Sequence, residues 1–163
     1  MFRSLMHASF FAEDIDAIYD FYVNRLGAKV KMLIRNRAYA DKPGHAFYER
    51  AQKDPDGLCI IYFEIAPGQF IEFFPKQDGQ KEHNGYNTNL GYSHIGILVD
   101  DLLETKRELE ARGVKFITEP KIGNSHTWQM WTKDPEGNYM EFMQYTPESF
   151  QIIGHIDEVI GEK

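Results

Sequence analysis

The hydrophobic pattern of this chain occurs twice in the same order. Largely apolar runs at residues 5–11 and 92–99 predict two strands, because short apolar segments are typical of buried strands. Each run is followed by a segment with apolar residues at helical spacing, from Ile15 to Leu26 and from Leu102 to Ala111. The chain therefore predicts a strand and an amphipathic helix in each of two halves.

The two predicted helices also share their end signals. Asp14 and Asp101, which lie 87 residues apart, precede the first turns, where a carboxylate complements the exposed backbone N–H groups. Gly27 and Gly113 follow the last turns, and glycine suits the left-handed conformation that ends a helix. The repeat thus includes the helix termini.

Three more strands complete each half. A strand is predicted directly after each helix, at residues 29–34 and 115–118. Tight turns at residues 66–69 and 134–138 then lead into the last strands, because Pro-Gly and Asp-Pro-Glu-Gly-Asn are strong turn sequences. The pattern predicts the α+β class, with two tandem βαβββ modules.

The length of 163 residues suits one domain. We expect module one at about residues 3–75, a linker at 76–91, module two at 92–145 and a tail helix at 146–161. The first half is 18 residues longer between its histidine and its glutamate, and the polar segment from Arg35 to Gly57 accounts for this excess. Thr146 and Pro147 predict the start of the tail helix.

One histidine and one glutamate lie inside apolar strands of each half: His7 and Glu72, then His94 and Glu141. A carboxylate among large apolar residues is costly to desolvate unless charge and hydrogen bonds compensate it. Two imidazole nitrogens and two carboxylate oxygens suit a divalent first-row metal ion, with two positions left for water or substrate. Two other interpretations stay open: a histidine satisfied within the core, and a glutamate that reaches solvent.

These motifs resemble a glyoxalase I-type protein of the vicinal oxygen chelate superfamily, over about residues 5–34 and 58–145. The resemblance rests on His7, the helix end Asp20-Phe21-Tyr22 to Leu26-Gly27, Ile71-Glu72, the strand from His94 to Val99, and Asp134-Pro135-Glu136-Gly137-Asn138 before Glu141.

The resemblance implies a fold and a chemistry. The two modules are expected to form a curved mixed sheet around a metal-centred cavity, commonly completed by a homodimer. His7, Glu72, His94 and Glu141 are the implied ligands of a divalent ion, with nickel, cobalt or zinc favoured over manganese or iron. The implied reaction converts a hemithioacetal of a 2-oxoaldehyde and a thiol into a 2-hydroxyacyl thioester. Glu141 is the expected catalytic base, with Glu72 as the second choice.

Three other functions remain as alternatives. Extradiol dioxygenases and fosfomycin-type thiol transferases of the same superfamily are expected to use two histidines and one glutamate. Glu72 fills a position that those enzymes leave without a protein ligand, so the four-residue set favours the isomerase type. The aromatic content of 14% also permits a non-catalytic protein that sequesters a small aromatic compound.

The composition limits the partners. The net charge of −7 without a basic block argues against nucleic acid, and no apolar run approaches the 18 residues of a membrane span. The single cysteine, Cys59, cannot form an internal disulfide and reads as a small buried hydrophobic residue. We therefore predict a cytoplasmic protein with a small-molecule substrate.

Substrate contacts are the least defined part of the prediction. The segment after the second predicted strand carries four basic residues that could bind an acidic thiol: Arg35, Arg37, Lys42 and Arg50. The other interpretation is that this segment is an ordinary solvated loop. In the strand predicted before the Asp134 turn, His126 and Trp128 share one face and are candidates to line the cavity, while Trp131 falls on the other face. Core or interface packing is the alternative for all three.

Overall fold

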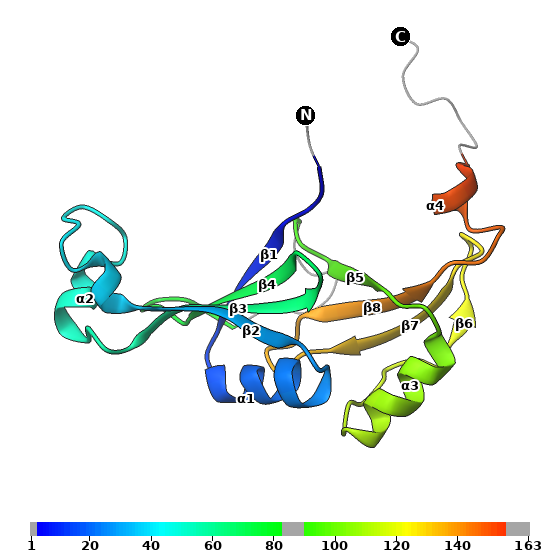
Figure 1. Ribbon diagram of the computed structural model, residues 1–163, viewed down its shortest axis with the longest axis horizontal. Helices are drawn as coiled ribbons and strands as arrows, with labels where there is room; N and C mark the ends of the chain where they lie inside the picture. Colours follow the sequence, from blue (N-terminus) through cyan, green and yellow to red (C-terminus); the bar gives the residue numbers. More distant parts are fainter. Residues whose placement is uncertain (1–2, 83–89, 156–163) are drawn as a thin grey trace, which may run out of the picture. The chain divides into compact units, whose positions relative to one another are not determined.

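Figure 1 shows the computed structural model of the chain, which describes residues 3–82 and 90–155. The chain divides into two compact units, residues 1–83 and 84–163, each with a four-stranded sheet. The first unit contains β1 (His7–Ala12), α1 (Ile15–Tyr19), η1 (Asp20–Arg25), β2 (Lys29–Arg35), η2 (Asn36–Tyr39), α2 (Tyr48–Lys53), β3 (Leu58–Ala66) and β4 (Gln69–Pro75). The second contains β5 (His94–Leu98), α3 (Leu102–Ala111), β6 (Lys121–Ile122), β7 (Trp128–Lys133), β8 (Tyr139–Gln144) and α4 (Phe150–Ile153).

The two sheets have the same topology. Their strand orders are β1-β4-β3-β2 and β5-β8-β7-β6, so the first strand of each unit pairs with the last. That pairing is parallel in both sheets, while the other neighbours are antiparallel. The predicted α+β class with two βαβββ modules is confirmed.

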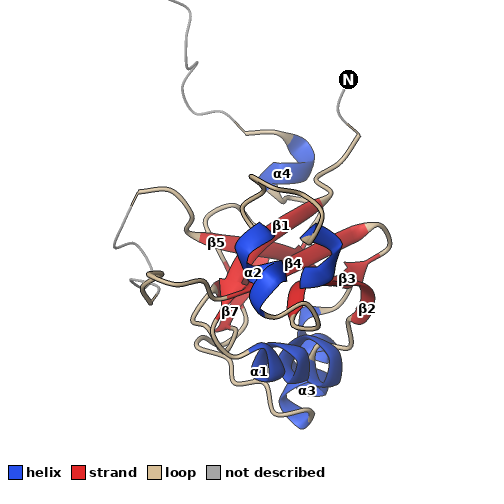
Figure 2. Ribbon diagram, turned by 90° about the vertical axis from the view of Figure 1, so that its left-hand side faces the viewer, coloured by secondary structure: helices blue, strands red, loops and turns tan. Residues whose placement is uncertain are grey.

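One face of the first sheet is covered by α1 and η1 (Figures 1 and 2). The fully buried ring of Tyr22 stacks on Phe63 at a centroid distance of 5.4 Å and lies 5.3 Å from Phe73. Ile18 of α1 is also fully buried. Because successive strand residues point to opposite faces, Glu72 faces away from this aromatic core.

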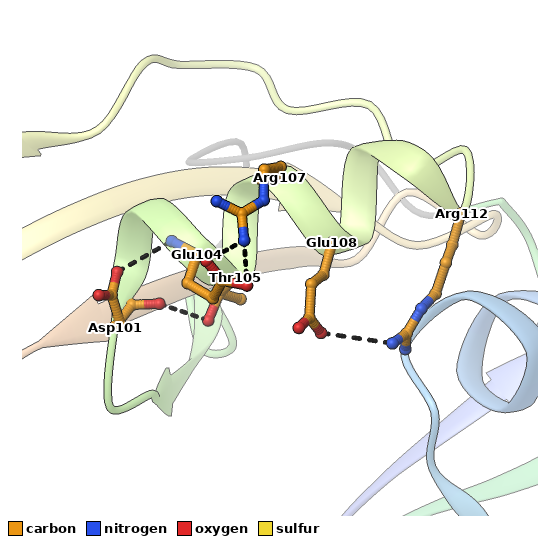
Figure 3. Close-up of polar contacts among 6 residues, drawn as sticks. All are labelled: Asp101, Glu104, Thr105, Arg107, Glu108 and Arg112. Carbon is orange, nitrogen blue, oxygen red and sulfur yellow. Dashed lines mark hydrogen bonds and ion pairs between the residues drawn. The ribbon is translucent and has the colours of Figure 1, made fainter.

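The helix α3 covers the second sheet through contacts with β7 and β8, and it buries Leu102 and Leu109. Its N-terminus is capped as predicted: the Asp101 side chain accepts the Glu104 backbone N–H at 2.9 Å, and the Asp101 carbonyl accepts the Thr105 hydroxyl at 2.6 Å (Figure 3). Ion pairs follow along the helix, among them Glu104–Arg107 and Glu108–Arg112 (Figure 3). An apolar face and a charged face thus orient this helix.

The predicted turn between β7 and β8 is built around the buried side chain of Asp134. Its Oδ1 accepts the backbone N–H groups of Glu136 at 3.0 Å and Asn138 at 2.9 Å, and its Oδ2 accepts the Asn138 side-chain amide at 2.9 Å. Gly137 has φ of 84°, a conformation that glycine adopts without strain. This network leads the chain into β8, which carries Glu141.

Replacement of Asp134 by alanine is expected to lower the free energy of unfolding by about 2 to 3 kcal/mol, because buried N–H groups lose their acceptor. The matched control is Asp101→Ala, which removes an exposed helix cap and is expected to cost about 1 kcal/mol. Urea denaturation of the variants measures both values. An Asp134→Ala loss no larger than that of the control would contradict the role of this turn.

Two local predictions differ from the structure. The strand expected at residues 115–118 is wrong, since the corresponding strand is β6, a few residues later. Ile117 donates to the Trp131 carbonyl at 2.6 Å, but the Trp131 N–H donates to the Thr118 hydroxyl at 3.0 Å. A side-chain acceptor thus takes the place of a backbone ladder partner. The excess segment of the first half also contains η2 and α2, which extend beyond the strands in Figure 1.

The predicted tail helix is shorter than expected. In the described residues it is the four-residue helix α4, with Ser149 rather than Thr146 as its N-cap residue. Gly154 follows with φ of 74°, which ends the helix there. Residues 156–161 of the predicted tail and 83–89 of the predicted linker lie outside the described residues. Within the described segments, no helix has the length and apolar character needed to cross a membrane.

Candidate functional site

His7 and Glu72 lie on the same face of the first sheet. The parallel pairing of β1 and β4 places His7 opposite Phe70 and Ser9 opposite Glu72. The Nε2 atom of His7 lies 3.6 Å from Oε2 of Glu72. The other ring nitrogen, Nδ1, lies 2.9 Å from Sδ of Met6, so the ring turns Nε2 toward the carboxylate.

The second unit repeats this arrangement with His94 and Glu141. The register of β5 and β8 places His94 opposite Tyr139 and Gly96 opposite Glu141. Nε2 of His94 lies 3.4 Å from Oε2 of Glu141, and Nδ1 of the same ring lies 3.0 Å from the Ser93 hydroxyl. The sequence predicted one set of four metal ligands, and the structure brings two of them together within each unit.

The donor atoms of each pair fit two positions of a metal site. Two atoms bound to one ion at about 2.1 Å lie about 3.0 to 3.4 Å apart in octahedral or tetrahedral geometry, close to the measured separations. The carboxylates are 8% and 10% exposed and the imidazoles 37% and 31%, so each oxygen is shielded while the nitrogen reaches the surface of its unit. In the described parts of the chain, no three histidine, cysteine, aspartate or glutamate side chains gather into a metal cluster.

The Glu72 carboxylate accepts two hydroxyl hydrogen bonds. Ser9 donates to Oε2 from the neighbouring strand β1, and Tyr62 donates from the neighbouring strand β3, where it lies directly opposite Glu72. Burial, followed by the hydrogen bond and the charge of Glu72, raises the pKa of Tyr62 to about 12. The Tyr62 ring also lies edge-on to the His7 ring, with a distance of 5.5 Å between the ring centroids. The phenol therefore stays protonated and serves as a donor. Sequence reasoning missed both hydroxyls.

The surroundings of Glu141 differ. Gly96 and Trp131 flank it on the neighbouring strands, and the Trp131 ring lies edge-on to His94 at 4.7 Å. Burial raises the pKa of Glu141, while the charge of His94 and a hydrogen bond to its ring oppose this shift. Within the described residues, no hydroxyl donates to this carboxylate. The burial of Glu141 therefore makes it more basic than an ordinary carboxylate.

The predicted roles of the neighbouring aromatic residues are reversed. His126 precedes β7 and has φ of 55°, so the prediction that it shares a strand face with Trp128 is wrong. Trp128 pairs with Gln144, three positions from Glu141, and therefore faces the other side of the sheet. Trp131, assigned from sequence to the opposite face, is the tryptophan beside the His94–Glu141 pair. Trp128 and Trp131 do lie on opposite faces, but the register with β8, which local sequence does not reveal, places Trp131 on the face of Glu141.

Of the four basic residues predicted as candidate thiol contacts, two line a cavity in the first unit. Arg35 and Arg50 line a cavity of about 460 Å³ together with apolar residues that include Leu33 and Ile61. Ile61 precedes Tyr62, so this cavity opens on the face of the sheet opposite Glu72. The two remaining basic residues contact neighbours within their own segment: Arg37 pairs with Asp56, and Lys42 lies 5.0 Å from the centre of the Tyr39 ring.

Known proteins share this fold and sequence pattern. A glyoxalase family protein from Enterococcus faecalis superposes with a TM-score of 0.65 at 20% identity, covering 87% of this chain and 98% of that one. A lactoylglutathione lyase from Agrobacterium tumefaciens superposes with a TM-score of 0.57 at 19% identity, covering 93% and 97%. These likenesses establish the fold.

Sequence comparison identifies the family. The chain is 23% identical over 146 residues to a protein of Arabidopsis thaliana named "Probable lactoylglutathione lyase, chloroplastic", and it spans 37% of the length of that relative. The sequence profile of the Glyoxalase/Bleomycin resistance protein/Dioxygenase superfamily matches residues 4–142. With the duplicated modules and their two histidine–glutamate pairs, this match shows that the chain belongs to that superfamily.

Proposed function

We propose that this protein is a metal-dependent lyase of the glyoxalase type, which converts a hemithioacetal of a 2-oxoaldehyde and a thiol into a 2-hydroxyacyl thioester. The observation that carries the proposal is the pair of a histidine nitrogen and a buried carboxylate in each unit. The relatives named as lactoylglutathione lyases support the same reaction class.

The proposed metal ligands are His7, Glu72, His94 and Glu141. Members of this superfamily of the glyoxalase I type are typically metal-dependent, and the mixed nitrogen and oxygen donors suit nickel, cobalt or zinc, with manganese or iron as further candidates. A divalent ion held there supplies positive charge that polarises a carbonyl and stabilises the charge left by proton removal. The two imidazoles present Nε2 because Nδ1 of each contacts a neighbouring side chain.

The proposed proton carrier is Glu141. Its burial raises its pKa, and a carboxylate with a raised pKa is a stronger base toward a C–H bond. In this mechanism the Glu141 carboxylate takes the proton from C1 of the substrate and returns it to C2. Glu72, which accepts the hydroxyls of Ser9 and Tyr62, is the better candidate for fixed ligation. The buried aromatic surroundings of both carboxylates limit access of water.

A homodimer and a cytoplasmic location stay predictions from the resemblance and the composition. Superfamily members bind small molecules, and we expect the same of this chain. The thiol component of the substrate is open to direct test, because Arg35 and Arg50 line a cavity on the face of the sheet opposite Glu72.

The decisive experiment is reconstitution of the metal-free protein with nickel, cobalt, zinc, manganese or ferrous ions, followed by assay with hemithioacetals of several thiols. We expect at least one ion to restore turnover about 100-fold or more over the metal-free protein. His7→Ala is expected to abolish this gain, while His45→Ala, a loop histidine stacked on Tyr39, is the matched control and retains it.

Other outcomes identify the alternatives. Oxygen uptake with a catechol indicates a ring-cleaving dioxygenase, and conjugation of fosfomycin indicates a thiol transferase. Binding of an aromatic compound that survives chelation and loss of all four proposed ligands indicates a sequestering protein. Each of these results, without hemithioacetal turnover, overturns the proposed reaction.

A further inference from the structure

The cavity beside Arg35 and Arg50 has no role in the proposed reaction. We propose that it is a binding site for a small amphipathic monocarboxylate, whose carboxylate is held by the two arginines and whose apolar part lies on the aliphatic floor of the cavity. The cavity volume of about 460 Å³ falls within the range of small-molecule sites in proteins. This inference goes beyond the proposed function and does not depend on it.

Strand register places the floor of the cavity on the face of the first sheet that α1 covers. Leu33 of β2 and Ile61 of β3 lie directly opposite each other, and both line the cavity. The next residue of β3, Tyr62, lies opposite Glu72 and points to the other face. The sheet therefore separates the cavity from the Glu72 carboxylate.

The segment that lengthens the first unit supplies the cationic wall of the cavity. Arg50 lies in α2, which extends beyond the strands in Figure 1, and Arg35 is the last residue of β2. A register shift between Ile34 and Arg35 places Arg35 opposite Leu58, which also lines the cavity. In the second unit, where the connection between β6 and β7 is fully described, no helix corresponds to α2. The cavity is thus a feature of the first unit and not of the duplicated frame.

Both guanidinium groups retain N–H groups that a ligand can use. Arg35 donates to the Asp56 carbonyl at 3.2 Å, and Arg50 donates to the carbonyls of Pro75 and Leu58 at 3.4 Å each. These long contacts use only part of the five N–H donors of each guanidinium. Among the residues that the structure describes, no carboxylate forms an ion pair with either arginine. An anion is therefore the ligand that this wall favours.

The charge of the lining defines the head group of the ligand. Asp16 of α1 is the other charged residue of the cavity, so the lining carries a net charge of plus one. A monocarboxylate neutralises this charge, and its planar head group matches the fork of a guanidinium. A phosphate monoester carries nearly two negative charges at neutral pH and would repel Asp16.

The rest of the lining defines the body of the ligand. It is mainly aliphatic and aromatic, and three of its apolar residues are exposed: Tyr19, Val30 and Leu33. Exposed apolar side chains that gather at one concave surface are typical of ligand sites. An alkyl chain that covers these residues leaves water together with them, and this burial favours binding.

Titration of the metal-free protein with octanoate in a calorimeter tests the site. We expect one octanoate per chain with a Kd of about 1 mM or tighter. Affinity is expected to rise about two- to fourfold for each methylene group from hexanoate to decanoate. Octan-1-ol and octylamine lack the carboxylate and are expected to bind more weakly by about fivefold or more. Absence of octanoate binding overturns the site, and equal binding of octan-1-ol overturns the role of the arginines.

Substitution of the charged residues locates the octanoate head group. Arg50→Gln is expected to weaken binding about tenfold, and Arg35→Gln about threefold because Arg35 is more exposed. Arg37→Gln is the matched control, because Arg37 pairs with Asp56 and does not line the cavity. Asp16→Asn is expected to strengthen octanoate binding about two- to fivefold, and binding of octyl phosphate by a larger factor. Unchanged affinity in Arg50→Gln overturns the proposal.

A pair of neighbouring residues on β2 tests which face of the sheet octanoate covers. Leu33→Ser is expected to weaken octanoate binding about threefold or more. Met32→Ser is the matched control, because Met32 is also exposed but lies opposite Tyr62 on the Glu72 face. A loss in Met32→Ser as large as that in Leu33→Ser overturns the assignment of octanoate to this cavity. Thermal unfolding establishes that each variant is folded. Because all titrations use metal-free protein, none of these failures bears on the proposed lyase reaction.

Discussion

Replacement of Glu141 by glutamine is expected to lower kcat for hemithioacetal turnover by about 10²- to 10⁴-fold, the usual contribution of a general base. Glutamine has nearly the same shape and keeps one oxygen that can contact a metal, but it cannot carry the proton between C1 and C2. We therefore expect KM to change little, because substrate binding does not require the base. Steady-state kinetics at saturating metal measure both constants.

The matched control for this loss is Glu72→Gln. If Glu72 is a ligand and not the base, its replacement weakens metal affinity but leaves kcat within about 10-fold of the wild-type value once the site is saturated. Equal losses of kcat in both variants at saturating metal would contradict the assignment of the base to Glu141.

The stability of the metal-free Glu141→Gln variant provides an independent check. Burial raises the pKa of Glu141 in the folded protein, so the folded state binds more protons than the unfolded state as pH rises above the usual value of 4.5. Wild-type protein therefore loses stability as pH rises from 4.5 through the raised pKa, and the glutamine variant does not. We expect equal stability below pH 4.5 and a more stable variant at neutral pH, where the buried Glu141 carboxylate is charged and the glutamine is not.

Truncation of Phe73 to alanine is expected to lower the free energy of unfolding by about 3 to 5 kcal/mol. Phe73 has no exposed surface. The centroid of its ring lies 5.6 Å from that of Phe10, 5.3 Å from that of Tyr22 and 6.1 Å from that of Phe63. Removal of the ring leaves a cavity between η1 and the first sheet that these neighbours fill only in part. Urea denaturation measures the loss.

Phe11 is the matched control, because it is 45% exposed and lies on β1 outside this aromatic core. We expect Phe11→Ala to cost less than half as much. A comparable loss in both variants would mean that the core between η1 and the sheet does not dominate the stability of this unit. The Phe73 prediction would then be wrong.

Most of the fold could be predicted from local patterns. The helix α3, its cap at Asp101 and the left-handed glycines Gly27 and Gly113 follow from signals within a few residues of each other. The strand expected at residues 115–118 failed for a tertiary reason, because the Thr118 hydroxyl, not a backbone carbonyl, accepts the Trp131 N–H. No signal in the neighbouring sequence reveals that a side-chain hydroxyl replaces a backbone carbonyl as this acceptor.

The candidate site, like the fold, could be predicted from the sequence only in part. The sequence by itself determined the duplicated order of histidine and glutamate, because an ionisable group in an apolar strand is visible from its neighbours. Only the tertiary structure decided that Ser9 and Tyr62 contact Glu72 and that Trp131 lies beside His94. Alternation along a strand predicts a face, but strand register decides which residues from distant segments meet on it. That register is a long-range property of the folded sheet.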